Sequence, residues 1–199
     1  MSKAGPRWKV QFRRKREGKT DYRQRIRLLR SGRPRLVVRP SLKHVVVQVS
    51  RATSSGDLII ASAHSRELLG LGWKAYTGNL PAAYLTGLLC GYRARKAGVD
   101  KCVLDLGMRN PTPKARVFAA LKGALDAGLD VPHGDGVLPT DEQVHGQHIV
   151  QYAKKIKSDE EIYRTRFSGY FKRKFSPEQL PEHFNQIREA IIEQYEGHT

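Results

Sequence analysis

The cationic and aromatic side chains at the beginning of the chain are the residues best placed to do chemistry. Residues 1–43 contain eleven Arg and five Lys against two acids, so they supply +14 of the formal net charge of +17. Arginine grips phosphates through a planar fork of donors and also stacks on bases. Trp8, Phe12 and Tyr22 lie among these cations and add further stacking surfaces. The segment therefore predicts a polyanionic partner, and RNA in particular.

The positive charge is confined to one end of the chain. Residues 44–140 contain eleven Lys and Arg against seven Asp and Glu, and residues 141–199 contain nine against ten. A tail that only keeps a protein soluble would also be charged, but it has no reason to prefer Arg over Lys. Because the sequence has no helix-turn-helix, zipper or zinc-finger pattern, we expect RNA rather than DNA as the partner.

Three aspartates offer an alternative, enzymatic chemistry. Asp105 lies near the end of a predicted strand, and together with Asp57 and Asp126 it could form a two-carboxylate metal site for phosphodiester cleavage. Three scattered aspartates also occur in most domains of this size, so this interpretation is only an alternative. The residue types therefore favour a specific RNA-binding protein. Two alternatives stay open, a magnesium-dependent RNA-processing enzyme and a non-specific RNA chaperone.

The other candidate ligands do not form a recognisable metal or cofactor site. His145 and His148 are three residues apart, but no Cys or carboxylate is spaced to complete a familiar zinc set. Gly70 and Gly72 lack the third glycine and the strand-to-helix position of a dinucleotide fingerprint. We therefore expect no zinc site and no cofactor.

Composition also indicates the compartment. No apolar run approaches the roughly 20 residues that cross a bilayer, and residues 1–9 lack the apolar stretch of a secretion signal. Cys90 and Cys102 are isolated in apolar surroundings, which is typical of buried thiols. We expect a cytoplasmic protein without membrane contact.

The basic segment contains one predicted helix. Residues 2–19 are polar and almost without periodicity, so we expect them to fold only on their partner. Thr20 or Asp21 can cap a short helix that Gly32 and Pro34 end. Its apolar positions are Tyr22, Ile26 and Leu29.

Residues 35–128 alternate in the order β-β-β-α-β-α. The predicted strands cover 35–39, 44–50, 58–63 and 101–106, and the predicted helices run from Asn79 to Gly98 and from Thr112 to Gly128. Short turns imply antiparallel neighbours, and a right-handed crossover should add the fourth strand in parallel. We expect an α/β fold with a mixed, largely antiparallel sheet and packed helices. We attribute the GxxxG spacing of Gly87 and Gly91 to close packing of their helix on the sheet.

The C-terminal part is predicted to be helical, with helices over 141–157, 159–167 and 177–195. In the last helix Phe184, Ile187, Ile191 and Ile192 share one face, so it needs the core domain or another macromolecule to pack against. The chain thus divides into three parts. These are a basic RNA-binding arm and short helix (1–34), an α/β core domain (35–139) and a helical extension (140–199).

Several segments resemble one known family. Residues 5–10, 12–22 and 28–39 (GPRWKV, FRRKREGKTDY and LLRSGRPRLVVR) are similar to the opening of archaeal large-subunit ribosomal protein L-eighteen, whose eukaryotic counterpart is L-five. Residues 62–68, 83–89, 117–128, 131–133 and 180–184 resemble the later blocks of that family. The similarity extends over nearly the entire chain, with Trp8 where many relatives have Tyr.

The resemblance implies a structural protein without catalysis. Its expected partners are 5S rRNA, the large-subunit rRNA and neighbouring ribosomal proteins of the central protuberance, and its expected location is the cytoplasmic ribosome. The residues expected to bind RNA are Arg7, Trp8, Lys9, Phe12, Arg13, Arg14, Lys15, Arg16, Lys19, Thr20, Tyr22, Arg23, Arg25, Arg27, Arg30, Arg33, Arg35 and Arg39, followed by Lys43, His44, His64 and Ser65.

Overall fold

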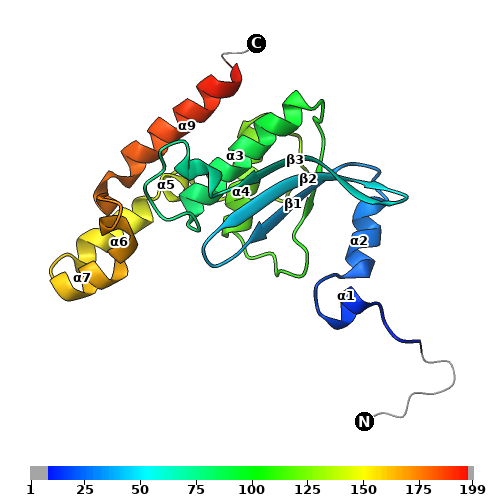
Figure 1. The fold of residues 1–199 in the computed structure, drawn as a ribbon, viewed down its shortest axis with the longest axis horizontal. Helices are drawn as coiled ribbons and strands as arrows, with labels where there is room; N and C mark the ends of the chain where they lie inside the picture. The colour runs from blue at the N-terminus through cyan, green and yellow to red at the C-terminus, as the bar shows by residue number, and fades with distance from the viewer. Residues whose placement is uncertain (1–8, 197–199) are drawn as a thin grey trace, which may run out of the picture.

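The structure is a computed structural model that describes residues 9–196 (Figure 1). Arg7 and Trp8, which the sequence places among the RNA-binding residues, lie outside the described residues. The middle of the chain contains three consecutive strands, then a helix, a fourth strand and a second helix, and a run of short helices leads to a long C-terminal helix.

The four strands form one mixed sheet in the order β3-β2-β1-β4. The strands are β1 (Arg35–Pro40), β2 (Val45–Thr53), β3 (Gly56–His64) and the short β4 (Val103–Asp105). The first three are antiparallel neighbours, and β4 pairs in parallel with β1, where Val37 lies opposite Asp105. The predicted fold class and strand directions are confirmed.

Two helices cover one face of the sheet. α3 (Leu80–Lys96) packs on β2 and β3, and α4 (Arg116–Asp126) packs on α3 and β1. Asn79 caps α3 through its side chain, as predicted, whereas α4 begins at Arg116 rather than near Thr112. Alternate strand residues such as Leu36, Val38 and Val47 are buried beneath these helices.

The GxxxG glycines serve helix–helix packing, so the prediction that they pack on the sheet is wrong. A Cβ added at Gly87 would lie 1.9 Å from the carbonyl oxygen of Ala120 on α4, and one at Gly91 would lie 2.6 Å from the Cβ of Ala127. The absence of side chains lets the two helix backbones approach closely. The sequence showed the small residues but not which element they contact.

Two short helices precede the sheet: α1 (Arg13–Arg16) and α2 (Tyr22–Leu29). The carboxylate of Asp21 accepts hydrogen bonds from the backbone N–H groups of Arg23 and Gln24, so Asp21, rather than Thr20, is the cap of α2. No residue of either helix is buried. The helices therefore depend on a few polar contacts with the sheet rather than on a core of their own.

The C-terminal part contains more helices than the sequence indicated. They are α5 (Asp141–Val144), α6 (Gln147–Ile156), α7 (Glu160–Arg166), α8 (Ser168–Phe171) and α9 (Leu180–Glu196), with the 3-10 turn η2 (Pro177–Gln179) directly before α9. A second 3-10 turn, η1 (Glu67–Leu69), follows β3. The predicted helix over 141–157 is divided at Gly146, whose φ of 81° is left-handed.

The apolar face of α9 packs against the core, which answers the question left open by the sequence. Phe184 and Ile191 are buried, and the ring of Phe184 lies 5.5 Å from that of Tyr84 on α3. His183 stacks on Trp73 at 5.2 Å, and its Nε2 atom accepts a hydrogen bond from the backbone N–H of Lys74. This helix thus closes the hydrophobic core.

The two cysteines are free and buried, as predicted. Burial raises the pKa of the Cys90 thiol to about 12 and that of Cys102 to about 11. Within residues 9–196, no helix combines the length and the apolar character needed to cross a membrane.

Candidate nucleic-acid interface

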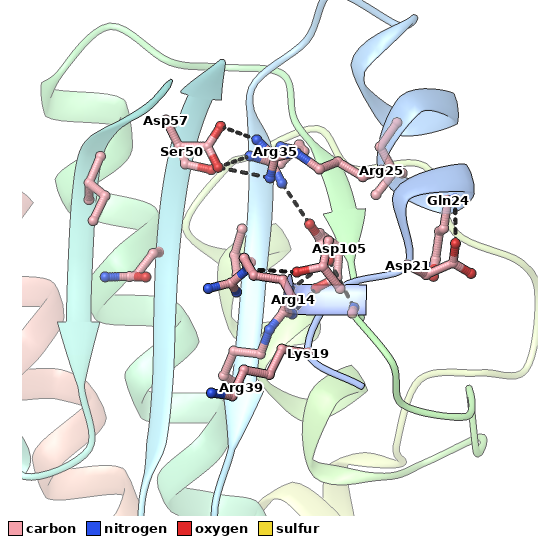
Figure 2. A pocket seen from close by; sticks show the side chains of 16 residues that line it. Arg14, Lys19, Asp21, Gln24, Arg25, Arg35, Arg39, Ser50, Asp57 and Asp105 are labelled. Carbon is pink, nitrogen blue, oxygen red and sulfur yellow. Dashed lines mark hydrogen bonds and ion pairs between the residues drawn. The ribbon is translucent and has the colours of Figure 1, made fainter. Parts of the chain in front are cut away.

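The face of the sheet away from α3 and α4 forms a cleft with the basic segment. Because side chains alternate along a strand, Val37, Arg39 and Gln48 point away from the buried valines of β1 and β2. Side chains of α1, α2 and the turn between them complete the cleft (Figure 2). The segment with the highest charge density is therefore held beside an open sheet surface.

Two hydrogen bonds attach α2 to the sheet. The guanidinium of Arg25 donates to both carboxylate oxygens of Asp57 on β3, at 2.9 and 2.8 Å. Arg35 on β1 lies within 2.7 Å of the same carboxylate (Figure 2). The Arg25 bonds and the Arg35 pair lower the pKa of Asp57 against the opposing effect of burial. A bidentate pair of this kind fixes orientation as well as distance.

Asp105 at the end of β4 continues this network. It accepts hydrogen bonds from Arg35 and Arg39, each at 2.8 Å, and from the backbone N–H of Gly107. Burial raises the pKa of the Asp105 carboxyl, but the arginines and the Gly107 bond together lower it below its ordinary value. The carboxylate therefore stays charged and holds two strands together.

These contacts weigh against the alternative of a two-carboxylate metal site. The carboxylates of Asp57 and Asp105 are occupied by arginines, and Asp126 accepts a hydrogen bond from the hydroxyl of Tyr84 at 2.6 Å. The part of the chain that the structure describes contains no group of three or more metal-ligating side chains.

Most of the predicted RNA-binding residues lie exposed along the arm and α2. The ring of Phe12 lies 5.1 Å from that of Tyr22, and Phe12 is 71% exposed. Glu17 forms ion pairs of 2.7 Å with Arg13 and Lys19, and Arg14 donates to the hydroxyl of Thr20. The exposed cations are Lys9, Arg13, Arg14, Lys15, Arg16, Lys19, Arg23, Arg27, Arg30, Arg33, Arg39 and Lys43.

Two of the predicted RNA-binding residues, Arg35 and Ser65, are buried rather than exposed. Arg35 is 3% exposed and Ser65 is fully buried, where its hydroxyl accepts a hydrogen bond from the backbone N–H of Val45. Direct contact with RNA requires an accessible side chain. The positions of these two residues therefore favour structural roles.

A second group of predicted residues lies at one end of β2 and β3. The rings of His44 and His64 are 4.9 Å apart, and His44 Nδ1 is 3.2 Å from the hydroxyl of Thr77. Burial and the nearby charge of His64 lower the pKa of His44. Arg39 and His64 both lie opposite Val46 in the sheet register, so this pair is at the same end as Arg39.

The cleft also contains residues that charge patterning did not indicate. Gln24, Val37, Gln48 and Ile59 line it together with six predicted residues: Arg14, Lys19, Thr20, Arg25, Arg35 and Arg39. Strand alternation could have indicated Gln48, because it stands between the core residues Val47 and Val49. The position of Gln24 depends on how α2 meets the sheet, and the sequence does not encode that locally.

An exposed, arginine-rich segment fixed beside an open sheet face is the architecture of an RNA-binding protein. Residues 6–101 and 93–134 match the family described as ribosomal large subunit proteins 60S L5, and 50S L18. These matches cover more than half of the chain, so the chain belongs to this family. It is a constituent of the large ribosomal subunit with ribosomal RNA as its partner, in a family of structural proteins rather than enzymes.

Proposed function

We propose that this protein binds 5S rRNA and helps to attach it to the large-subunit rRNA in the central protuberance, beside neighbouring ribosomal proteins. Family membership supports a ribosomal RNA partner. The observation that carries the proposal is the attachment of the cationic helix α2 to the sheet through Arg25 and Asp57. This attachment presents one continuous surface from the arm to Arg39.

Electrostatics supply most of the affinity in this proposal. Neutralising about eight phosphates releases their counterions and gives a log–log salt slope on the order of −6 to −7. The exposed ring of Phe12 and the half-buried ring of Tyr22 add stacking on unpaired bases. Shape-dependent selection of the RNA then comes from the fixed position of α2 over the sheet.

The proposal assigns three roles along the chain. Residues 1–34 bind RNA, residues 35–139 form the supporting α/β domain, and residues 140–199 form a helical extension. The packing of α9 on α3 supports a scaffolding role for the last part. The site residues are the exposed cations of the arm and α2 with Phe12, Tyr22, Lys43, His44 and His64.

Binding of labelled 5S rRNA in the presence of excess bulk transfer RNA tests this proposal. The triple variant Arg13→Gln, Arg14→Gln, Arg16→Gln should lose on the order of 1,000-fold in affinity, because each of the three charged hydrogen bonds contributes about 1.5 kcal/mol. The matched control Arg164→Gln, Arg166→Gln, Lys172→Gln removes the same charge from exposed positions of the extension. We expect the control to lose less than about threefold.

Equal losses from the two triple variants would show that net charge, rather than the arm, determines binding. Equal affinity for 5S rRNA and transfer RNA would instead identify a chaperone without a preferred target. A stable one-to-one complex with intact 5S rRNA in the presence of Mg²⁺ is the expected result.

A further inference from the structure

The cleft between the basic segment and the sheet has the size of a small-ligand site. Its volume is about 320 Å³, close to the lower end of the range of roughly 300–1,000 Å³ for such sites. Arg14 and Lys19 approach it from the arm, and Arg39 approaches it from β1 (Figure 2). A cleft of this size holds one nucleotide and excludes a duplex.

The charges of the cleft favour an anionic ligand. Five cations line it against the three carboxylates of Asp21, Asp57 and Asp105. Each carboxylate is already engaged: Asp21 caps α2, and the other two are held by Arg25, Arg35 and Arg39. Among the described residues Arg14 has no carboxylate partner, and its bond to the Thr20 hydroxyl orients the guanidinium. Arg14 is therefore available for a phosphate.

The remaining lining suits a base rather than a phosphate alone. Neither the Gln24 nor the Gln48 side-chain amide hydrogen-bonds to a residue of the described chain, although both line the cleft. An amide offers donors and an acceptor, which match the hydrogen-bonding edge of a base. Val37, Leu28 and Ile59 add apolar surface for its ring. The cations of the cleft therefore match the phosphate of a nucleotide, and the amides and apolar side chains match its base.

We propose that this cleft binds a single unpaired nucleotide of 5S rRNA, with its phosphate on Arg14 and Lys19 and its base against Gln24 and Gln48. The inference rests on the proposed function, because the arm must first bring that RNA to the sheet. This arrangement would make binding depend on the folded shape of the RNA. Only an RNA with an unpaired nucleotide at the correct distance from the RNA helix held by the arm fills the cleft.

Chemical probing of the base edges of 5S rRNA tests the inference at nucleotide resolution. With saturating protein, one unpaired nucleotide should be protected by the wild-type chain. In Gln48→Met that nucleotide alone should become reactive again, with a five- to tenfold loss of affinity from one hydrogen bond left unmade. Gln24→Met is the second variant, and thermal unfolding shows that both are folded.

The matched control is Arg23→Gln, which removes an exposed charge of α2 that does not line the cleft. It should weaken binding but leave the footprint unchanged at saturation. An identical footprint for the wild-type, Gln48→Met and Gln24→Met proteins would overturn the inference while leaving 5S rRNA binding intact.

A second measurement does not depend on 5S rRNA. Nucleoside monophosphates added to the isotope-labelled protein should shift the NMR signals of the Gln24 and Gln48 side-chain amides, whereas inorganic phosphate should shift only those of Arg14, Lys19 and their neighbours. Identical shifts from nucleotide and phosphate would reduce the cleft to an anion site and contradict recognition of a base. If the protein failed to bind 5S rRNA but nucleoside monophosphates still shifted the Gln24 and Gln48 amide signals, the proposed function would be contradicted. Recognition of a nucleotide by the cleft would then still be supported.

Discussion

Arg25 on α2 and Asp57 on β3 lie 32 residues apart in sequence and form two parallel hydrogen bonds of 2.9 and 2.8 Å. Because neither α1 nor α2 contains a buried residue, this pair is a principal link between the cationic segment and the sheet. Arg35 and Asp105 extend the link to β1 and β4. The position of the RNA-binding charges thus depends on an ion-pair network within the protein.

Arg25→Gln should lower 5S rRNA affinity with little change in the salt slope, because it releases α2 while every phosphate-binding side chain is retained. The matched variant Arg23→Gln removes an exposed charge from the same helix. It should reduce the magnitude of the slope by about 0.7–0.9 for each phosphate that the variant no longer neutralises. Filter binding across a range of salt concentrations measures both variants. An equal fall in slope would show that Arg25 binds phosphate directly.

Asp105→Asn should destabilise the fold by about 3 kcal/mol, because it leaves the buried Arg35 guanidinium without its full charge partner. The pair is 2.8 Å long with both side chains less than 10% exposed. The control Asp130→Asn disrupts a 3.9 Å pair with Lys101 in which both side chains are more than 60% exposed. It should change stability by less than about 1 kcal/mol. Urea unfolding gives both values, and similar losses would contradict the assigned role of Asp105.

The sequence predicted the strands and helices better than it predicted which side chains contact one another. The three meander strands and the caps Asp21 and Asn79 depend on neighbouring residues, so local patterns identify them. Asp57 and Asp105, in contrast, suggested a metal site because their arginine partners are supplied by distant positions. Charge pattern also grouped Arg35 with the exposed arginines, although strand pairing buries it.

The glycines also show that a local pattern does not identify the tertiary neighbour of a residue. Gly87 and Gly91 were recognisable as a close-packing pair, but only the tertiary structure shows that α4 is the neighbour. Gly146 divides a stretch that otherwise has helical periodicity, because its left-handed conformation brings the chain against Leu180. Cleft residues such as Gln24 become identifiable only once α2 is placed on the sheet.

Gly87→Ala should destabilise the protein by about 2 kcal/mol or more, because the new Cβ would meet the Ala120 carbonyl oxygen and push α3 and α4 apart. Gly169→Ala is the control, since no heavy atom lies within 4 Å of a Cβ at that position on α8. It should be neutral or slightly stabilising through helix propensity. Thermal unfolding compares them. A tolerated Gly87→Ala would contradict the close approach of the two helices.

His183 should make the packing of α9 sensitive to mild acid. Burial lowers the pKa of its imidazole below the ordinary value of 6.5, with a smaller contribution from the charge of Lys74 opposed by Gln186. Its contribution to stability is therefore complete above pH 6.5 and is lost as the pH falls through the folded-state pKa. His183→Phe keeps the aromatic contacts but removes the acceptor for the Lys74 N–H.

At pH 7.5 this variant should lose about 1 kcal/mol, the value of one hydrogen bond. Between pH 7.5 and 5 it should lose less stability than the wild-type protein does. Urea unfolding at several pH values provides the comparison. Parallel stability curves for the two proteins would rule out His183 as a source of the acid sensitivity.

The salt dependence of 5S rRNA affinity, measured for the full chain and for the chain without residues 1–20, tests the central claim most directly. Those residues contain eight Lys and Arg. The full chain should give a log–log slope on the order of −6 to −7, and removal of the segment should reduce its magnitude by about 3 or more and weaken binding at every salt concentration. A shortened chain that binds with the same affinity and the same slope would contradict the account.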